Sequence, residues 1–174
     1  MTQGLIIEES DMTFCFRDSD IVYHIEQSRQ YQDRLRGKGL KICEFIMRRD
    51  EFLYLVEAKR TCPNSSKREI DGGVTMQVQK YIGDIKAKMA DSLALYSAIL
   101  LKKQSQDDVP AAMLVPDLSG TKIRLLLIVK NAEKKWLVPL QDKLRAELRK
   151  ECRLWNAELW VLNEEIAKSK HFVE

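Results

Sequence analysis

The sequence predicts an α/β fold with a mixed central β-sheet flanked by helices. Two strand-like segments, 42–47 and 52–59, are separated only by the polar residues 48–51, which is typical of a hairpin. A long segment with helical periodicity follows at 76–103. Residues 122–129 are too apolar for a strand with one face in water, so we expect this strand to lie in the middle of the sheet. Strands that alternate with helices in this way place the helices on the faces of a sheet.

The other elements are expected on either side of this group. Short strands are predicted at 4–8 and 12–16, a helix at 20–36, loops at 62–66 and 71–73, an amphipathic helix at 140–154 and a last strand at 158–162. Ser19 or Asp20 is the expected cap of the helix at 20–36, and two glycines end it. A length of 174 residues, of which 45% are hydrophobic, suits one domain over 1–174.

Composition limits the possible partners and the compartment. The net charge is only +3, which is compatible with a polyanionic partner without requiring one. The four cysteines form no CxxC pair, so we expect reduced thiols and a cytoplasmic protein rather than a zinc site. The beginning of the chain lacks the basic and apolar regions of a signal peptide, and no apolar run is long enough for a membrane span. We therefore expect no membrane partner.

The hairpin brings two glutamates to one face. Side chains alternate along a strand, so Glu57 and Lys59 share a face with apolar neighbours. If Asp50 and Glu51 form a two-residue turn, Glu44 lies opposite Glu57. Two carboxylates on an apolar face repel each other and require a positive charge. Lys59 is one candidate for that charge, and a divalent cation is the other.

These residue types favour one chemistry. Ligands that are all oxygen atoms select Mg²⁺ or Mn²⁺ over zinc. A cation held by two carboxylates can stabilise the charge that develops on a phosphodiester and lower the pKa of a water molecule. A neighbouring lysine can orient that water and add positive charge. The pattern predicts hydrolysis of phosphodiester bonds.

The same residues resemble the PD-(D/E)XK nuclease superfamily. The similarity lies in Glu44 on one strand and Glu57-Ala58-Lys59 on the next. It implies a restriction-endonuclease-like fold, in which a helix precedes a three-stranded meander, a second helix and a further strand. It also implies that Glu44, Glu57 and the backbone carbonyl of Ala58 bind Mg²⁺ or Mn²⁺. Lys59 would then serve the attacking water.

Three more residues resemble accessory positions of that superfamily. Gln77 and Tyr81 match the QxxxY helix motif of its exonuclease-like branch, and the spacing of four residues places them on one helix face. Glu26 resembles an additional acidic residue that some members use as a metal ligand. The sequence also departs from the pattern, since Cys43 stands where proline is common and Glu44 replaces the commoner aspartate.

Two functions from different classes follow as expectations. The first is a metal-dependent nuclease with DNA as its expected substrate, assisted by a partner protein or a second copy of the chain. The second is a non-catalytic module on the same fold that binds nucleic acid or protein through basic pairs such as Lys59-Arg60 and Lys67-Arg68. A purely structural reading also stands, in which Glu57 and Lys59 form a strand-end salt bridge, while Gln77 and Tyr81 only pack a helix.

Overall fold

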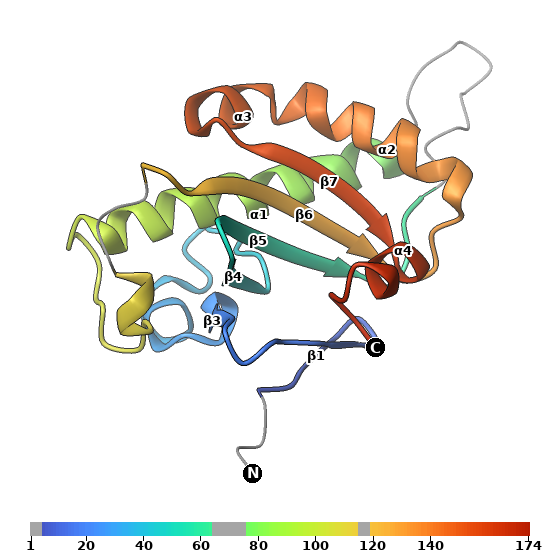
Figure 1. Cartoon of the computed structure of the whole chain (residues 1–174). Helices are drawn as coiled ribbons and strands as arrows, with labels where there is room; N and C mark the ends of the chain where they lie inside the picture. Colours follow the sequence, from blue (N-terminus) through green and yellow to red (C-terminus); the bar gives the residue numbers. More distant parts are fainter. Residues whose placement is uncertain (1–4, 64–75, 115–118) are drawn as a thin grey trace.

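A computed structural model describes residues 5–63, 76–114 and 119–174 (Figure 1). Its centre is a five-stranded sheet with the strand order β3-β4-β5-β6-β7. The strands are β3 (Ile21–Tyr23), β4 (Phe45–Arg49), β5 (Phe52–Lys59), β6 (Lys122–Val129) and β7 (Glu158–Asn163). The pairs β3–β4 and β4–β5 are antiparallel, whereas β5–β6 and β6–β7 are parallel. The predicted α/β class with a mixed sheet is confirmed.

Helices cover both faces of this sheet. The helices are α1 (Met76–Leu100), α2 (Lys134–Glu147), α3 (Arg149–Trp155) and α4 (Glu164–Ser169). Buried side chains of α1 and α2 share one apolar core with one face of the sheet, and α4 contributes to a second core on the other face (Figure 1). β6 lies between these cores with six consecutive buried residues. The placement of 122–129 in the middle of the sheet is therefore confirmed. None of the helices in the described ranges combines the length and apolar character needed to cross a membrane.

The first two strands form a separate hairpin under the second core. β1 (Ile7–Glu9) pairs antiparallel with β2 (Met12–Phe14), in agreement with the strands expected at 4–8 and 12–16. Ile7, Met12 and Phe14 are buried against the main sheet. β1 ends at Glu9, which is half-buried. The hairpin therefore places a carboxylate of the N-terminal segment beside the sheet.

The predicted hairpin register is confirmed. Phe45 pairs with Val56 and Arg49 with Phe52, which leaves Asp50 and Glu51 as the two-residue turn. Asp50 adopts a positive φ of 55°, a conformation that the tight turns of hairpins require. β5 continues beyond the end of β4, so its last three residues pair only with β6. That extension contains the Glu57-Ala58-Lys59 motif.

The helix predicted over 20–36 is wrong. This segment contains β3, a short 3₁₀ turn at Ile25–Gln27 (η1) and a π-helical segment at Gln30–Leu35 (η2). Ile21 and Tyr23 pair with β4 instead of beginning a helix, because edge pairing satisfies their backbone groups and buries Tyr23. Asp20 is not a helix cap, since its carboxylate accepts hydrogen bonds from the backbone of Arg17 and the side chain of Arg49.

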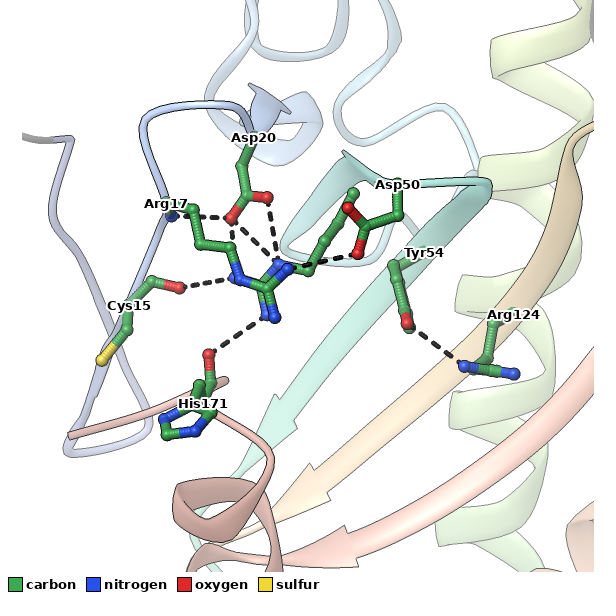
Figure 2. A network of polar contacts seen from close by, with 8 residues as sticks. Cys15, Arg17, Asp20, Asp50, Tyr54, Arg124 and His171 are labelled. Carbon is green, nitrogen blue, oxygen red and sulfur yellow. Dashed lines mark hydrogen bonds and ion pairs between the residues drawn. The ribbon is translucent and has the colours of Figure 1, made fainter.

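A buried ion pair connects this segment with both ends of the chain. The Nη2 atom of Arg49 lies 2.6 Å from Oδ2 of Asp20, and both side chains are buried. The same guanidinium donates hydrogen bonds to the carbonyl oxygens of Cys15 and His171, at 3.0 and 3.1 Å. Figure 2 shows Asp20, Cys15 and His171 around one guanidinium group, with His171 far from the other two in the sequence. This network holds β3, β4 and the C-terminal segment together.

The bounds predicted for the other helices differ less from the observed ones. The helix predicted over 140–154 begins earlier and divides at Leu148 into α2 and α3, because Leu148 leaves the helical conformation while its side chain stays buried. The helix predicted over 76–103 ends at Leu100, and Lys102 has a positive φ. α4 was not predicted. Residues 64–66 and the loop at 71–73, together with Lys67-Arg68, lie outside the described residues.

Candidate functional site

The site is built around Glu57, which the sheet buries completely. Glu57 lies in the extension of β5, and its exposed fraction is 0%. It shares the face of Leu53 and Leu55, as alternation predicts, and this face packs against α1. Neither carboxylate oxygen of Glu57 accepts a hydrogen bond of normal geometry from the described residues. A buried carboxylate in this situation requires positive charge close by.

Two lysines supply part of that charge. The Nζ atoms of Lys59 and Lys88 lie 2.7 and 2.9 Å from the same oxygen of Glu57, Oε1. Lys59 comes from the end of β5 and Lys88 from the middle of α1. The Nζ atom of Lys88 also lies 3.6 Å from Oε1 of Glu44. Lys88 therefore bridges the two glutamates that the hairpin brings together.

Glu44 precedes β4 and belongs to a second group of carboxylates. Its backbone N–H donates to the carbonyl of Val56 at 3.0 Å, which holds Glu44 next to the extension of β5. One oxygen each from Glu9, Glu26 and Glu44 can be chosen so that all three lie within 4.8 Å of one another. Glu26 comes from η1, and its backbone N–H donates to the carbonyl of Glu44 at 3.3 Å. Three separate segments thus converge on one point, and Glu57 is not a member of this group.

The pKa values of the carboxyl groups reflect crowding and burial. Burial, a hydrogen bond with Glu26 and the charge of Glu57 raise the pKa of Glu44 to about 9. Burial also raises the pKa of Glu57, even though Lys88 and Lys59 oppose the shift. The pKa of Glu9 is raised by burial and by the charges of Glu26 and Glu57. Burial alone would lower the pKa of Lys88, but the charges of Glu57 and Glu44 raise it overall.

The charges of this cluster do not balance. Four carboxylates, from Glu9, Glu26, Glu44 and Glu57, face two ammonium groups, from Lys59 and Lys88. When all six groups are ionised, four negative and two positive charges leave a net charge of −2. Burial is the first cause of the raised pKa values of Glu44 and Glu57, and for Glu44 the neighbouring carboxylates add to it. One divalent cation would neutralise the net charge, and the all-oxygen donor set fits Mg²⁺ or Mn²⁺.

Ala58 and Glu26 occupy positions consistent with their expected roles. Ala58 lies beyond the last β4 pairing, so β4 provides no ladder partner for this part of β5. Its side chain points into the second core, away from the carboxylates. Glu26 stands beside Glu44, but on a 3₁₀ turn rather than on the helix predicted for it.

The two residues of the QxxxY motif differ in their exposure to solvent. Gln77 is exposed, whereas Tyr81 is half-buried and its hydroxyl is inaccessible to solvent without a hydrogen-bond partner in the described part of the chain. Burial, then the charges of Cys62 and Glu57, raise the pKa of Tyr81. Gln77 and Tyr81 line a shallow surface pocket of about 270 Å³ with Lys80 and Asp84. Tyr81 therefore has a buried hydroxyl that is influenced by the charge of Glu57, and Gln77 lies at the solvent end of the same helix face.

Sequence reasoning missed Glu9, Lys88 and His24. The Nε2 atom of His24 lies 3.8 Å from Oε1 of Glu9, and burial lowers the pKa of His24. Lys88 follows Tyr81 by seven residues, which is two helical turns, so the helix spacing held a signal for it. Glu9 offered no comparable signal, because its approach depends on how the N-terminal hairpin docks.

Comparison with known proteins gives no match for this chain among protein-family models, curated proteins or solved structures.

Proposed function

We propose that this protein is a metal-dependent nuclease that hydrolyses phosphodiester bonds, with DNA as its substrate. The observation that carries the proposal is a cluster of four carboxyl groups and only two ammonium groups, which includes a fully buried glutamate, Glu57, whose two oxygens accept no hydrogen bond in the described ranges. A buried deficit of positive charge destabilises a fold unless binding of a cation offsets it. Such a cluster is therefore better explained by a ligand than by stability.

The arrangement of the elements supports a restriction-endonuclease-like assignment. An antiparallel meander of β3, β4 and β5 is followed by α1 and by the parallel strand β6. This is the order that the PD-(D/E)XK resemblance implies after its first helix, whereas the helix expected before the meander, at 20–36, is not formed. Glu44 precedes the second strand of the meander, and the Glu57-Ala58-Lys59 motif ends the third.

Each residue has a definite part in the proposed reaction. Glu44 and Glu57, with the carbonyl of Ala58, would hold Mg²⁺ or Mn²⁺, and Glu9 and Glu26, which lie close to Glu44, would extend the donor set. Such an ion would stabilise charge on the phosphodiester and lower the pKa of a water molecule.

Lys59 acts on the water side of the site. Its side chain is 31% exposed, so its ammonium group lies at the boundary between the buried carboxylate and solvent. There it orients the attacking water and stabilises negative charge in the transition state. Tyr81 closes the helix side of the site, and Gln77 faces the solvent where substrate would approach.

Exposed cations at the same edge of the sheet suit a nucleic-acid substrate. Arg60 directly follows β5 and Lys130 directly follows β6, so both lie at the carboxyl ends of adjacent parallel strands. Arg60 pairs with Asp11, and Lys134 near the start of α2 pairs with Glu165; all four side chains are more than half exposed. Surface pairs of this kind contribute little to stability, so a phosphate can replace the carboxylate.

The proposal is tested by cleavage of single- and double-stranded DNA and of RNA with Mg²⁺ or Mn²⁺. We expect cleavage of DNA that is lost with a chelator and in Glu57→Gln. Glu147→Gln is the matched control, because Glu147 pairs with Lys86 on the surface at 3.2 Å. Wild-type protein that cuts none of these substrates with either ion would reject the nuclease.

A second function is favoured by the position of Lys88. An ammonium group between Glu44 and Glu57 gives the buried carboxylates a partner without any metal. In that case the fold is a non-catalytic module that binds nucleic acid or protein. Binding of DNA that weakens with salt, without cleavage and without any effect of Mn²⁺, would support this module instead.

A further inference from the structure

Lys88 occupies the place between the two carboxylates that a shared cation would take. Its Nζ atom lies 2.9 Å from Oε1 of Glu57 and 3.6 Å from Oε1 of Glu44. A divalent ion bound to both oxygens at about 2.1 Å would lie within a few ångströms of this ammonium group. Two positive charges at that separation repel each other, so both cannot remain in place.

The geometry also allows Lys88 to leave. Its side chain is 18% exposed, so part of it already reaches solvent. Lys59 contacts Glu57 at 2.7 Å but forms no ion pair with Glu44, so it lies outside the position that the two carboxylates share and can still neutralise Glu57 when Lys88 leaves. A long, flexible lysine side chain can move its charge by several ångströms without moving the helix.

We infer that Lys88 is an exchangeable internal cation, which neutralises Glu57 and Glu44 in the metal-free protein and is displaced when a divalent ion binds. This inference rests on the proposed function, because it requires the metal site. The free energy of metal binding then includes the cost of displacing Lys88. The displaced ammonium group adds positive charge where the site meets solvent. The residue is thus a positioning residue that sets metal affinity.

The test measures Mn²⁺ binding by calorimetry in Lys88→Met, which keeps most of the side-chain volume and removes the charge. We expect binding at least about tenfold tighter than in wild type, since no ammonium group competes for the carboxylates. Lys86→Met is the matched control, because Lys86 lies on the same helix but pairs with Glu147. Equal or weaker binding in a folded Lys88→Met variant would overturn the inference while leaving the metal site intact.

A second measurement does not depend on a variant. In wild-type protein, NMR of the lysine ammonium groups follows Lys88 and Lys59 during titration with Mg²⁺. We expect the Lys88 signal to change to that of a solvated, rapidly exchanging ammonium group as the site fills. A Lys88 signal that stays unchanged while Mg²⁺ binds would refute the exchange. Absence of metal binding in wild type and in Lys88→Met would instead reject the proposed function itself, and the inference with it.

Discussion

The substitution Glu44→Gln tests whether the carboxylate of Glu44 serves a function or stabilises the fold. The substitution keeps the length of the side chain and an oxygen that Lys88 can approach, and it removes the charge. The pKa of Glu44 is raised from 4.5 to about 9, mainly by burial. A group whose pKa is higher in the folded state contributes stability that is complete below its unfolded pKa and is lost as the pH rises through its folded pKa.

The size of the expected change in the free energy of unfolding follows from the raised pKa of Glu44. At pH 7 the solution is about 2.5 units above the usual pKa, and one unit corresponds to about 1.4 kcal/mol. We therefore expect Glu44→Gln to raise the free energy of unfolding of the metal-free protein by about 1–3 kcal/mol at pH 7. At pH 5 the gain should fall below about 1 kcal/mol, because that pH is only about 0.5 units above the usual pKa of Glu44 and little free energy is then needed to protonate it.

The assay is urea unfolding in the presence of a chelator at both pH values. Glu147→Gln is the control, and its effect should stay within about 0.5 kcal/mol because Glu147 is exposed. In parallel, Glu44→Gln should weaken Mn²⁺ binding. A variant that is less stable than wild type at pH 7 would show that Glu44 is an anion the fold requires, and the reasoning about missing positive charge would be wrong.

Three further predictions concern the same site and the network that holds its strands. Lys59→Ala should lower kcat by about 10²–10⁴. The free energy of unfolding should change little, because Lys88 still pairs with Glu57. A decrease of about 3–5 kcal/mol in that free energy would instead identify a structural salt bridge. Mn²⁺ affinity should increase as the pH rises from 6 to 8, by up to about tenfold per unit, because the ion replaces a proton on Glu44; calorimetry that shows a flat profile would contradict this. Arg49→Met should lower the free energy of unfolding by about 3–5 kcal/mol, since the carboxylate of Asp20 then stays buried without a cation. The same change at the half-exposed Arg48 should have little effect in a urea titration.

The hairpin of β4 and β5 could be predicted from the sequence because its determinants are local. Alternation fixes which side chains share a face, and a two-residue turn fixes which residues face each other. The observed pairs Phe45–Val56 and Arg49–Phe52 follow from those two rules. The buried position of β6 could also be predicted, because a continuous apolar run has no solvent-facing side.

For the segment 20–36, the local pattern of apolar residues predicted a helix that the structure does not contain. Its apolar residues at Ile21 and Ile25 fit a helical stripe, yet Ile21–Tyr23 becomes an edge strand. The choice depends on β4, whose free edge accepts the pairing, and on Arg49, whose guanidinium binds Asp20. Both partners are distant in sequence, so no local window contains the information.

The sequence by itself determined that two glutamates and a lysine share one face of a strand hairpin, because periodicity and turn length act within a few residues. Only the tertiary structure decided what surrounds them. Docking of the N-terminal hairpin brings Glu9 to Glu26 and Glu44, and packing of α1 on the sheet places Lys88 between Glu44 and Glu57. These contacts join segments far apart in the chain, and their geometry is set by how apolar faces pack rather than by the identity of neighbouring residues.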